Sequence, residues 1–164
     1  MNKVQTTCAG FTLIETLVYL GLFAIIMVGI VATAYGVFES NGRSQTKTMV
    51  QNEGDFMLAK INWALTGATA ISVVNSPLSL TITRASNPTS VVFDQSGNYL
   101  EINRNGAGGV NLNNSNVQIQ NLSFINAGHG TPTESVAVSF NLLANTPNGT
   151  QYSQNFQTTK YLRK

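Results

Sequence analysis

Charge is scarce in this chain. Charged residues make up 10% of its 164 residues, and the formal net charge is +2. Binding to a phosphate backbone needs a concentrated field of lysine and arginine, so nucleic acid is not expected as a partner. Disorder driven by high net charge is excluded on the same ground. A length near ~150 residues is typical of one domain.

Groups that carry chemistry are also rare. Cys8 is the only cysteine and His129 the only histidine, so neither a disulfide nor a zinc site can be built from them. Residues 94–98 (DQSGN) offer one carboxylate where a calcium loop collects several, which favours a hairpin turn there. No serine has an evident base partner. We therefore expect neither an enzyme, nor a metal, nor a cofactor.

What the sequence does contain is one long apolar run. Hydrophobic residues make up 43% of the chain, but they are concentrated near its start. From Thr16 to Phe38 there is no acidic, basic or amide side chain, and the run exceeds the ~20 residues that a helix needs to cross a membrane. A buried core helix is the alternative, but such helices are rarely apolar on every face. A cleaved secretory signal has a shorter apolar region and a small-residue cleavage site after it.

One acidic residue, Glu15, stands at the head of this run. A carboxylate in a membrane helix is costly, so its presence there indicates a functional role with a partner. The simpler alternative is that Glu15 lies at the level of the lipid headgroups and marks the start of the helix, where the helix dipole favours an acid.

The segment Gly10–Glu15 (GFTLIE), followed by TLV, resembles the leader and methylation motif of type IV pilins and type II secretion pseudopilins. This resemblance implies that residues 1–10 are a leader peptide, which a prepilin peptidase removes by cleaving between Gly10 and Phe11. It also implies N-methylation of the new amino terminus of Phe11. Glu15 would then be the fifth residue of the mature protein.

The resemblance further implies an assembly role for Glu15, whose carboxylate would pair with the Phe11 amine of a neighbouring subunit. The chain would be a structural subunit of a type IV pilus-like fimbrial filament or of a secretion pseudopilus. Its partners would be the prepilin peptidase, other pilin or pseudopilin subunits and an inner-membrane assembly platform. Lys3, the only basic residue of the leader, favours a cytoplasmic leader with the C-terminal head outside the cytoplasm.

Beyond the apolar run, helical spacing continues through about residue 68. Apolar residues recur mostly at helical intervals, at Val50, Met57, Ile61, Ala64, Leu65 and Ala68. We therefore predict one nearly continuous helix from about Phe11 to Thr66, with residues 11–38 as a transmembrane and assembly segment and residues 39–68 as its amphipathic extension.

Residues 69–164 predict a β-rich head. Short alternating runs are separated by turn signals, among them Ser96–Gly97, Asn105–Gly106 and Asn148–Gly149, and we expect one antiparallel sheet of roughly five to seven strands. One face of this sheet would cover the outer half of the helix. The predicted class is α+β, which corresponds to the pilin fold that the resemblance implies. The strand rhythm and the TTKYLR ending also resemble J-type minor pseudopilins and minor pilins.

A different class of protein competes with this interpretation. The chain could be a single-pass, membrane-anchored binding or adhesin module whose head acts outside the cytoplasm and never polymerises. In that case Glu15 would be incidental, and its replacement by leucine would leave display of the head unchanged.

Overall fold

The computed structural model describes residues 11–74, 78–127 and 134–162. Gly10, Lys3, Cys8 and His129 lie outside the described residues. The chain forms two compact units, residues 1–41 and residues 42–164, and each is described by itself.

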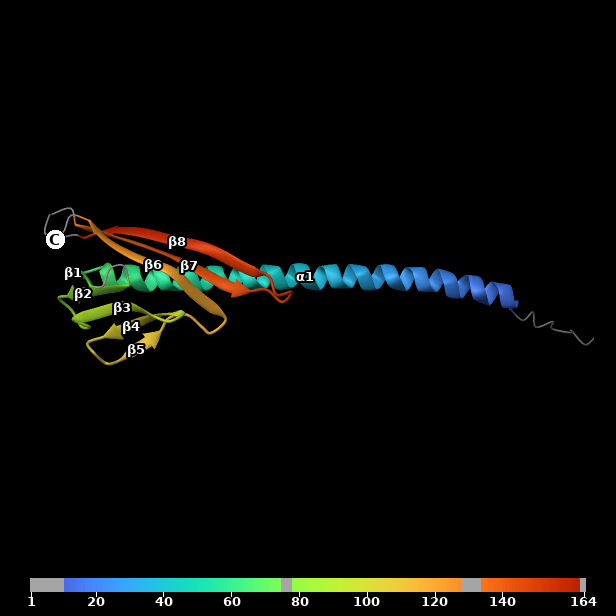
Figure 1. The fold of residues 1–164 in the computed structure, drawn as a ribbon, viewed down its shortest axis with the longest axis horizontal. Helices are drawn as coiled ribbons and strands as arrows, with labels where there is room; N and C mark the ends of the chain where they lie inside the picture. Colours follow the sequence, from blue (N-terminus) through green and yellow to red (C-terminus); the bar gives the residue numbers. More distant parts are fainter. Residues whose placement is uncertain (1–10, 75–77, 128–133, 163–164) are drawn as a thin grey trace, which may run out of the picture. The chain divides into compact units, whose positions relative to one another are not determined.

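One helix, α1, runs from Leu13 to Leu65, which confirms the predicted continuous helix (Figure 1). In its second half the buried residues recur every three or four positions and so form one face: Thr46, Val50, Gly54, Met57, Ile61, Ala64 and Leu65. All of the apolar positions that the helical spacing singled out are buried, but helical structure ends at Leu65 and Ala68 begins the first strand instead of extending the helix.

In the described residues after the helix, eight strands form two antiparallel sheets (Figure 1). The five-stranded sheet has its strands in sequence order: β1 (Ala68–Val74), β2 (Ser79–Arg84), β3 (Ser90–Ser96), β4 (Tyr99–Arg104) and β5 (Gly109–Asn111). The three-stranded sheet is likewise in sequence order: β6 (Val117–Ala127), β7 (Ser135–Asn145) and β8 (Gln151–Tyr161).

The division into two sheets differs from the single sheet that the sequence predicted. The described residues form eight strands where the sequence predicted roughly five to seven, and β6 pairs with β7 and not with β5. Each sheet buries one face, and two sheets can cover more of a helix of ~10–12 Å diameter than one twisted layer can. The additional strand, β5, consists of three exposed residues, so it has no alternation that the sequence could display.

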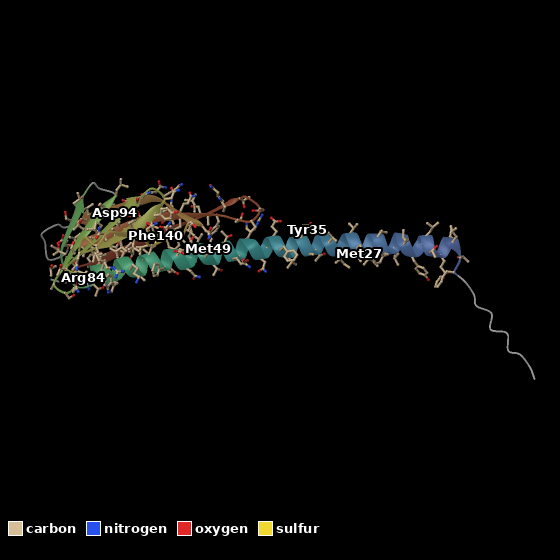
Figure 2. The ribbon with its side chains drawn as sticks, turned by 90° about the horizontal axis from the view of Figure 1, so that it is seen from below. Met27, Tyr35, Met49, Arg84, Asp94 and Phe140 are labelled. Carbon is tan, nitrogen blue, oxygen red and sulfur yellow. The ribbon has the colours of Figure 1, made fainter. Side chains whose placement is uncertain are left out.

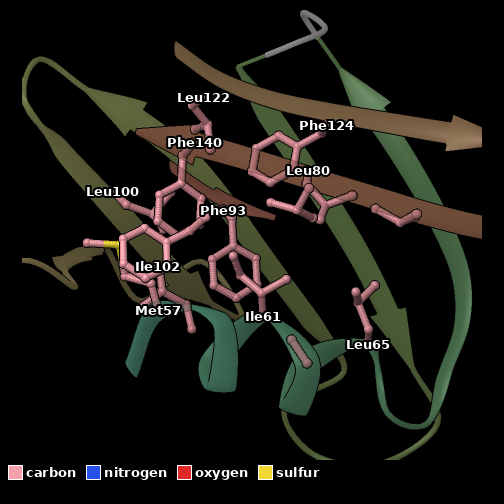
Figure 3. Packing of buried hydrophobic residues seen from close by; sticks show 14 of the residues in the cluster. Met57, Ile61, Leu65, Leu80, Phe93, Leu100, Ile102, Leu122, Phe124 and Phe140 are labelled. Atoms are coloured by element: carbon pink, nitrogen blue, oxygen red, sulfur yellow. The ribbon is translucent and has the colours of Figure 1, made fainter. Parts of the chain in front are cut away.

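Both sheets contribute to one hydrophobic core against α1 (Figure 3). Phe93 of β3, Phe124 of β6 and Phe140 of β7 are fully buried, as are Met57 and Ile61 of the helix. The ring of Phe140 stacks on that of Phe156 of β8, with centroids 5.6 Å apart and an interplanar angle of 18°. The folded head therefore depends on side chains from the helix and from both sheets.

A buried amide, Asn113, joins the two sheets. Its Oδ1 accepts a hydrogen bond from the backbone N–H of Leu100 at 2.9 Å. Its Nδ2 donates to the carbonyl oxygens of Asn98 at 3.0 Å and Val117 at 2.6 Å. Asn113 thus connects the β3–β4 hairpin and strand β4 to the first residue of β6, and it satisfies backbone groups that would be costly to bury alone.

Three of the predicted turns, at Ser96–Gly97, Asn105–Gly106 and Asn148–Gly149, lie between consecutive strands. Ser96–Gly97 lies at the β3–β4 turn, with Gly97 at φ 59°. Asn105 and Gly106 have φ values of 52° and 74°, the positive region that asparagine and glycine tolerate best. The hairpin turn predicted for the DQSGN segment therefore forms between β3 and β4.

Candidate functional site

The segment around Glu15 begins as a capped helix. The backbone N–H of Glu15 donates to Thr12 Oγ1 at 3.4 Å, and the N–H of Thr16 donates to the Thr12 carbonyl at 3.2 Å. Thr12 therefore satisfies a backbone donor that the first turn of a helix leaves unpaired. The sequence shows this cap as a threonine three residues before a glutamate, although the prediction of the helix start did not use that signal.

Tyr19 brings the two predicted site residues of the described chain into one cluster. Its hydroxyl donates to Glu15 Oε1 at 3.4 Å, since the two residues lie four apart on one helix face. The Phe11 ring meets the Tyr19 ring edge-to-face, with centroids 6.2 Å apart. Phe11 itself is 73% exposed. The sequence pattern identified Phe11 and Glu15 but missed Tyr19, which contacts both.

The helix around this cluster presents apolar side chains on every face. From residue 11 to residue 41 no residue is buried, and Glu15 is the only one that is even partly covered. Within the described residues α1 is long and apolar enough to cross a membrane, and its most apolar window is fully exposed. A surface this apolar requires either lipid or other apolar helices around it.

The threonine hydroxyls in this segment bond to the helix that carries them. Thr16 Oγ1 donates to the Leu13 carbonyl at 2.8 Å, and Thr33 Oγ1 donates to the Gly29 carbonyl at 2.8 Å. Such bonds satisfy the hydroxyl hydrogen without water. Both threonines are therefore compatible with a hydrocarbon environment.

An apolar groove runs along the same segment. Its volume is about 570 Å³, and its shape follows from the short side chains of Gly29, Thr33 and Ala34 between the larger Ile30 and Phe38. Small residues let helix backbones approach closely in membranes. The groove is therefore suited to contact with a second apolar helix.

Among the described residues, no three histidine, cysteine, aspartate or glutamate side chains converge as a metal site requires. A groove of about 750 Å³ in the head, between the helix and Leu112, has Glu53 as the one ionisable residue that lines it. Burial raises the pKa of Glu53, and a hydrogen bond from Asn114 Nδ2 to its Oε1 at 2.7 Å opposes that shift.

The chain was also compared with known proteins. Residues 6–31 match the family model described as the prokaryotic N-terminal methylation motif, which covers Gly10, Phe11, Glu15 and Tyr19. Comparison with curated proteins and with solved structures found no match. The likeness of the head to J-type minor pseudopilins stays a prediction.

Proposed function

We propose that this chain, whose N-terminal methylation motif supports membership of the type IV pilin and pseudopilin family, is a structural subunit of a pilus-like filament or secretion pseudopilus. The methylation motif supports processing by a prepilin peptidase, and the apolar helix supports membrane anchoring with a C-terminal head. The motif also points to a structural and not an enzymatic protein. In our proposal the head lies outside the cytoplasm, and the processed chain polymerises through residues 11–38.

The observation that carries this proposal is the one carboxylate in residues 11–38, a helical segment with no other charged side chain. Glu15 is partly covered by the chain itself, and within the described residues the one side chain that donates a hydrogen bond to its carboxylate is the hydroxyl of Tyr19. A lone neutral donor does not balance a carboxylate at membrane depth. A cationic group at the same depth would attract Glu15 far more strongly than it would in water.

Cleavage before Phe11 creates such a cation. While residues 1–10 remain attached, the nitrogen of Phe11 is part of a neutral peptide bond. After cleavage it is an amine beside the Phe11–Tyr19–Glu15 cluster. We propose that this amine pairs with Glu15 of a neighbouring subunit and sets the axial register of the filament, and that the inner-membrane assembly platform and other subunits are the partners in this step.

The decisive test compares Glu15→Ala and Glu15→Gln with the unchanged chain, expressed with its native assembly machinery. Filaments are sheared from cells and the incorporated subunit is quantified, while mass spectrometry determines the amino terminus. We expect a chain that begins at N-methylated Phe11 in all cases. Both variants should be nearly absent from filaments, because each removes the charge and Glu15→Gln preserves the shape.

Two outcomes would contradict the proposal. A mature chain that begins anywhere other than Phe11 would show that the motif is not processed as proposed. Filaments that incorporate both variants at the level of the unchanged chain would favour the membrane-anchored binding module, in which Glu15 has no assembly role.

A further inference from the structure

We propose that the head carries two complementary docking surfaces on opposite faces of the five-stranded sheet, through which one copy of this chain binds the next. The first surface is a cationic aromatic patch, defined as Trp63, Arg84 and Arg104. The second is an acidic row, defined as Asp94 and Glu101. This inference rests on the proposed function, because a filament is the setting in which identical heads meet in a repeating, head-to-tail manner.

The cationic aromatic patch is centred on an exposed tryptophan. Trp63 lies in the last turn of α1 and is 40% exposed. The guanidinium carbon of Arg84, at the end of β2, lies 4.6 Å from the centre of its ring, and that of Arg104, at the end of β4, lies 5.8 Å from it. Tryptophan and arginine are the residues most enriched among interface hot spots.

Arg84 is held firmly in this patch. Its Nη2 donates to the carbonyl of Thr66 at 3.3 Å, just beyond the end of α1. Its Nε and Nη1 are buried and have no hydrogen-bond partner. Arg104 is exposed. Neither guanidinium forms an ion pair within the part of the chain that the structure describes, so two like charges share one aromatic ring without an anion.

The acidic row repeats this arrangement with the opposite sign. Asp94 of β3 and Glu101 of β4 are directly opposite each other in the strand pairing, a placement in which like charges destabilise a sheet. The Oδ1 atom of Asp94 is buried without a hydrogen-bond partner. Gly109 of β5 provides the space for Glu101, since a Cβ at that position would overlap Glu101 Oε2.

Alternation along the strands places the two surfaces on opposite faces of one sheet. Arg84 and Arg104 share the face of the buried residues Ile82 and Ile102, and they overhang the end of α1. Asp94 and Glu101 share the outer face. Figure 2 shows Arg84 at the end of the helix and Asp94 away from it, across the sheet. One surface therefore cannot neutralise the other within a single head.

Contact with a second copy of the chain places the cationic aromatic patch of one head against the acidic row of the next. Each pair of like charges then lies beside charges of the opposite sign. Opposite charge steers the encounter of two surfaces, and like charge across an interface is strongly unfavourable. The contact joins two different surfaces, so it leaves one of each kind free at the ends of any oligomer. Such heterologous contacts extend into open helical filaments when they do not close into rings.

Disulfide cross-linking of the full chain in detergent micelles tests the contact. We would replace Cys8, the only cysteine, with serine and introduce Thr66→Cys beside Arg84 and Asn103→Cys on the face of Glu101. All four charges are retained, and the two thiols lie on opposite faces of the sheet and cannot join within one chain. We expect a ladder of linked oligomers from the double variant and no species beyond a dimer from either single variant.

Charge reversal then tests the chemistry of the contact. Each reversal is made as a pair of substitutions in the double-cysteine background: Arg84→Glu/Arg104→Glu for the cationic aromatic patch and Asp94→Lys/Glu101→Lys for the acidic row. Each pair should reduce the yield of linked oligomers by at least about tenfold. An equimolar mixture of the two variants should recover it, because the cationic patch of one then meets the acidic row of the other. Lys47→Glu/Lys60→Glu and Glu53→Lys/Asp55→Lys are the matched controls, since they make the same charge changes elsewhere on the head.

Trp63 supplies a second measurement because it is the only tryptophan. Its emission should shift to shorter wavelength as the protein concentration rises, and the shift should weaken when salt shortens the screening length from ~10 Å to ~3 Å. Arg84→Glu removes the bond to Thr66, so Arg104→Glu and Glu101→Lys alone are measured too. Circular dichroism melting checks that every variant is folded.

Several results would overturn the inference. These are a ladder that survives charge reversal, a mixture that fails to recover it, and a Trp63 shift that appears only when another protein is added, which would identify a different partner. Glu15→Ala separates this inference from the proposed function. If head contacts persist in micelles while that variant is incorporated normally, the proposed function fails. If filaments form normally with reversed head charges but not with Glu15→Ala, the inferred contact between heads is wrong and the proposed function stands.

Discussion

The two halves of α1 show how one kind of secondary structure can serve two surroundings. Residues 13–41 bury nothing, whereas every buried residue of the helix lies between Thr46 and Leu65. The first half is apolar on all faces and depends on lipid or neighbouring helices. The second half has one apolar face, which its own head covers. An unbroken helix can therefore have different surroundings in its two halves.

The glycines of the two halves of the helix differ in the same way, in the space around each Cα atom. A Cβ added at Gly21, Gly29 or Gly36 would have nothing within 4 Å. At Gly54 it would overlap the Phe156 ring, and at Gly42 it would lie 2.7 Å from the side chain of Pro147. In the head half, glycine is required by packing within the chain. In the apolar half, any requirement must come from other molecules.

The strongest way to test this contrast is to delete one large apolar side chain from each unit. Phe140→Ala should lower the free energy of unfolding of the head by about 3–5 kcal/mol, because it leaves a cavity in the core. Phe23→Ala, at an exposed position, should leave the unfolding of the head unchanged. Denaturant titration of the full chain in detergent, followed by Trp63 emission, measures both. Equal effects of the two substitutions would contradict the division into a buried and an unburied half.

A smaller effect is expected from adding one methyl group to each half of the helix. Gly54→Ala should destabilise the head by about 1–3 kcal/mol, because the new Cβ overlaps the Phe156 ring. Gly29→Ala meets no atom of the chain and should favour the helix by about 1 kcal/mol without affecting the head. The double variant Gly54→Ala/Phe156→Val should recover part of the loss. Circular dichroism melting measures all three, and a Gly54→Ala chain as stable as the parent would refute this account of the helix–sheet contact.

The smallest effect concerns charge, which residues 13–41 hold at Glu15 and Glu39 and the head holds at several positions. Burial, with the charge of Glu101, raises the pKa of Asp94 above its ordinary value of 3.8. The folded head thus binds this proton more tightly than the unfolded chain does. The resulting stabilisation is complete below pH 3.8 and is lost as the pH rises through the raised pKa.

Asp94→Asn should therefore stabilise the head at pH 7 by less than about 1 kcal/mol and flatten its pH dependence. Asp55→Asn is the control, because Asp55 is an exposed carboxylate that accepts hydrogen bonds from Gln51 Nε2 at 3.0 and 3.1 Å. Unfolding curves between pH 3 and 8 measure both variants, with the pH range chosen to bracket carboxylate titration. A loss of stability at pH 7 from Asp94→Asn would show that the sign of this effect is wrong.

Much of the fold follows from local pattern. Helical spacing identified the buried face of α1 at Val50, Met57 and Ile61, and alternation indicated a head built of antiparallel strands, because side-chain direction repeats with the period of each element. The three exposed residues of β5 carry no such pattern. The separation of β6 from β5 was also missed, because strand pairing is decided by contacts between distant residues, such as those of Asn113.

The candidate site divides in the same way. Phe11 and Glu15 stand out because a charge and a fixed motif are visible in a linear chain. Tyr19 could have been found from its position four residues after Glu15, but its edge-to-face contact with Phe11 requires coordinates. The cationic aromatic patch was beyond reach, because Trp63, Arg84 and Arg104 are separated by strands that only the folded sheet brings together.

By itself, the sequence determined the membrane-competent helix, the acid at its head, the β-rich nature of the rest and the family of the N-terminal motif. These depend on composition and on short periods along the chain. Only the tertiary structure decided that the head has two sheets, that Gly54 must be a glycine, and that unpaired charges of opposite sign lie on opposite faces of one sheet. Each of these depends on which distant residues share a surface, and burial and charge act through space.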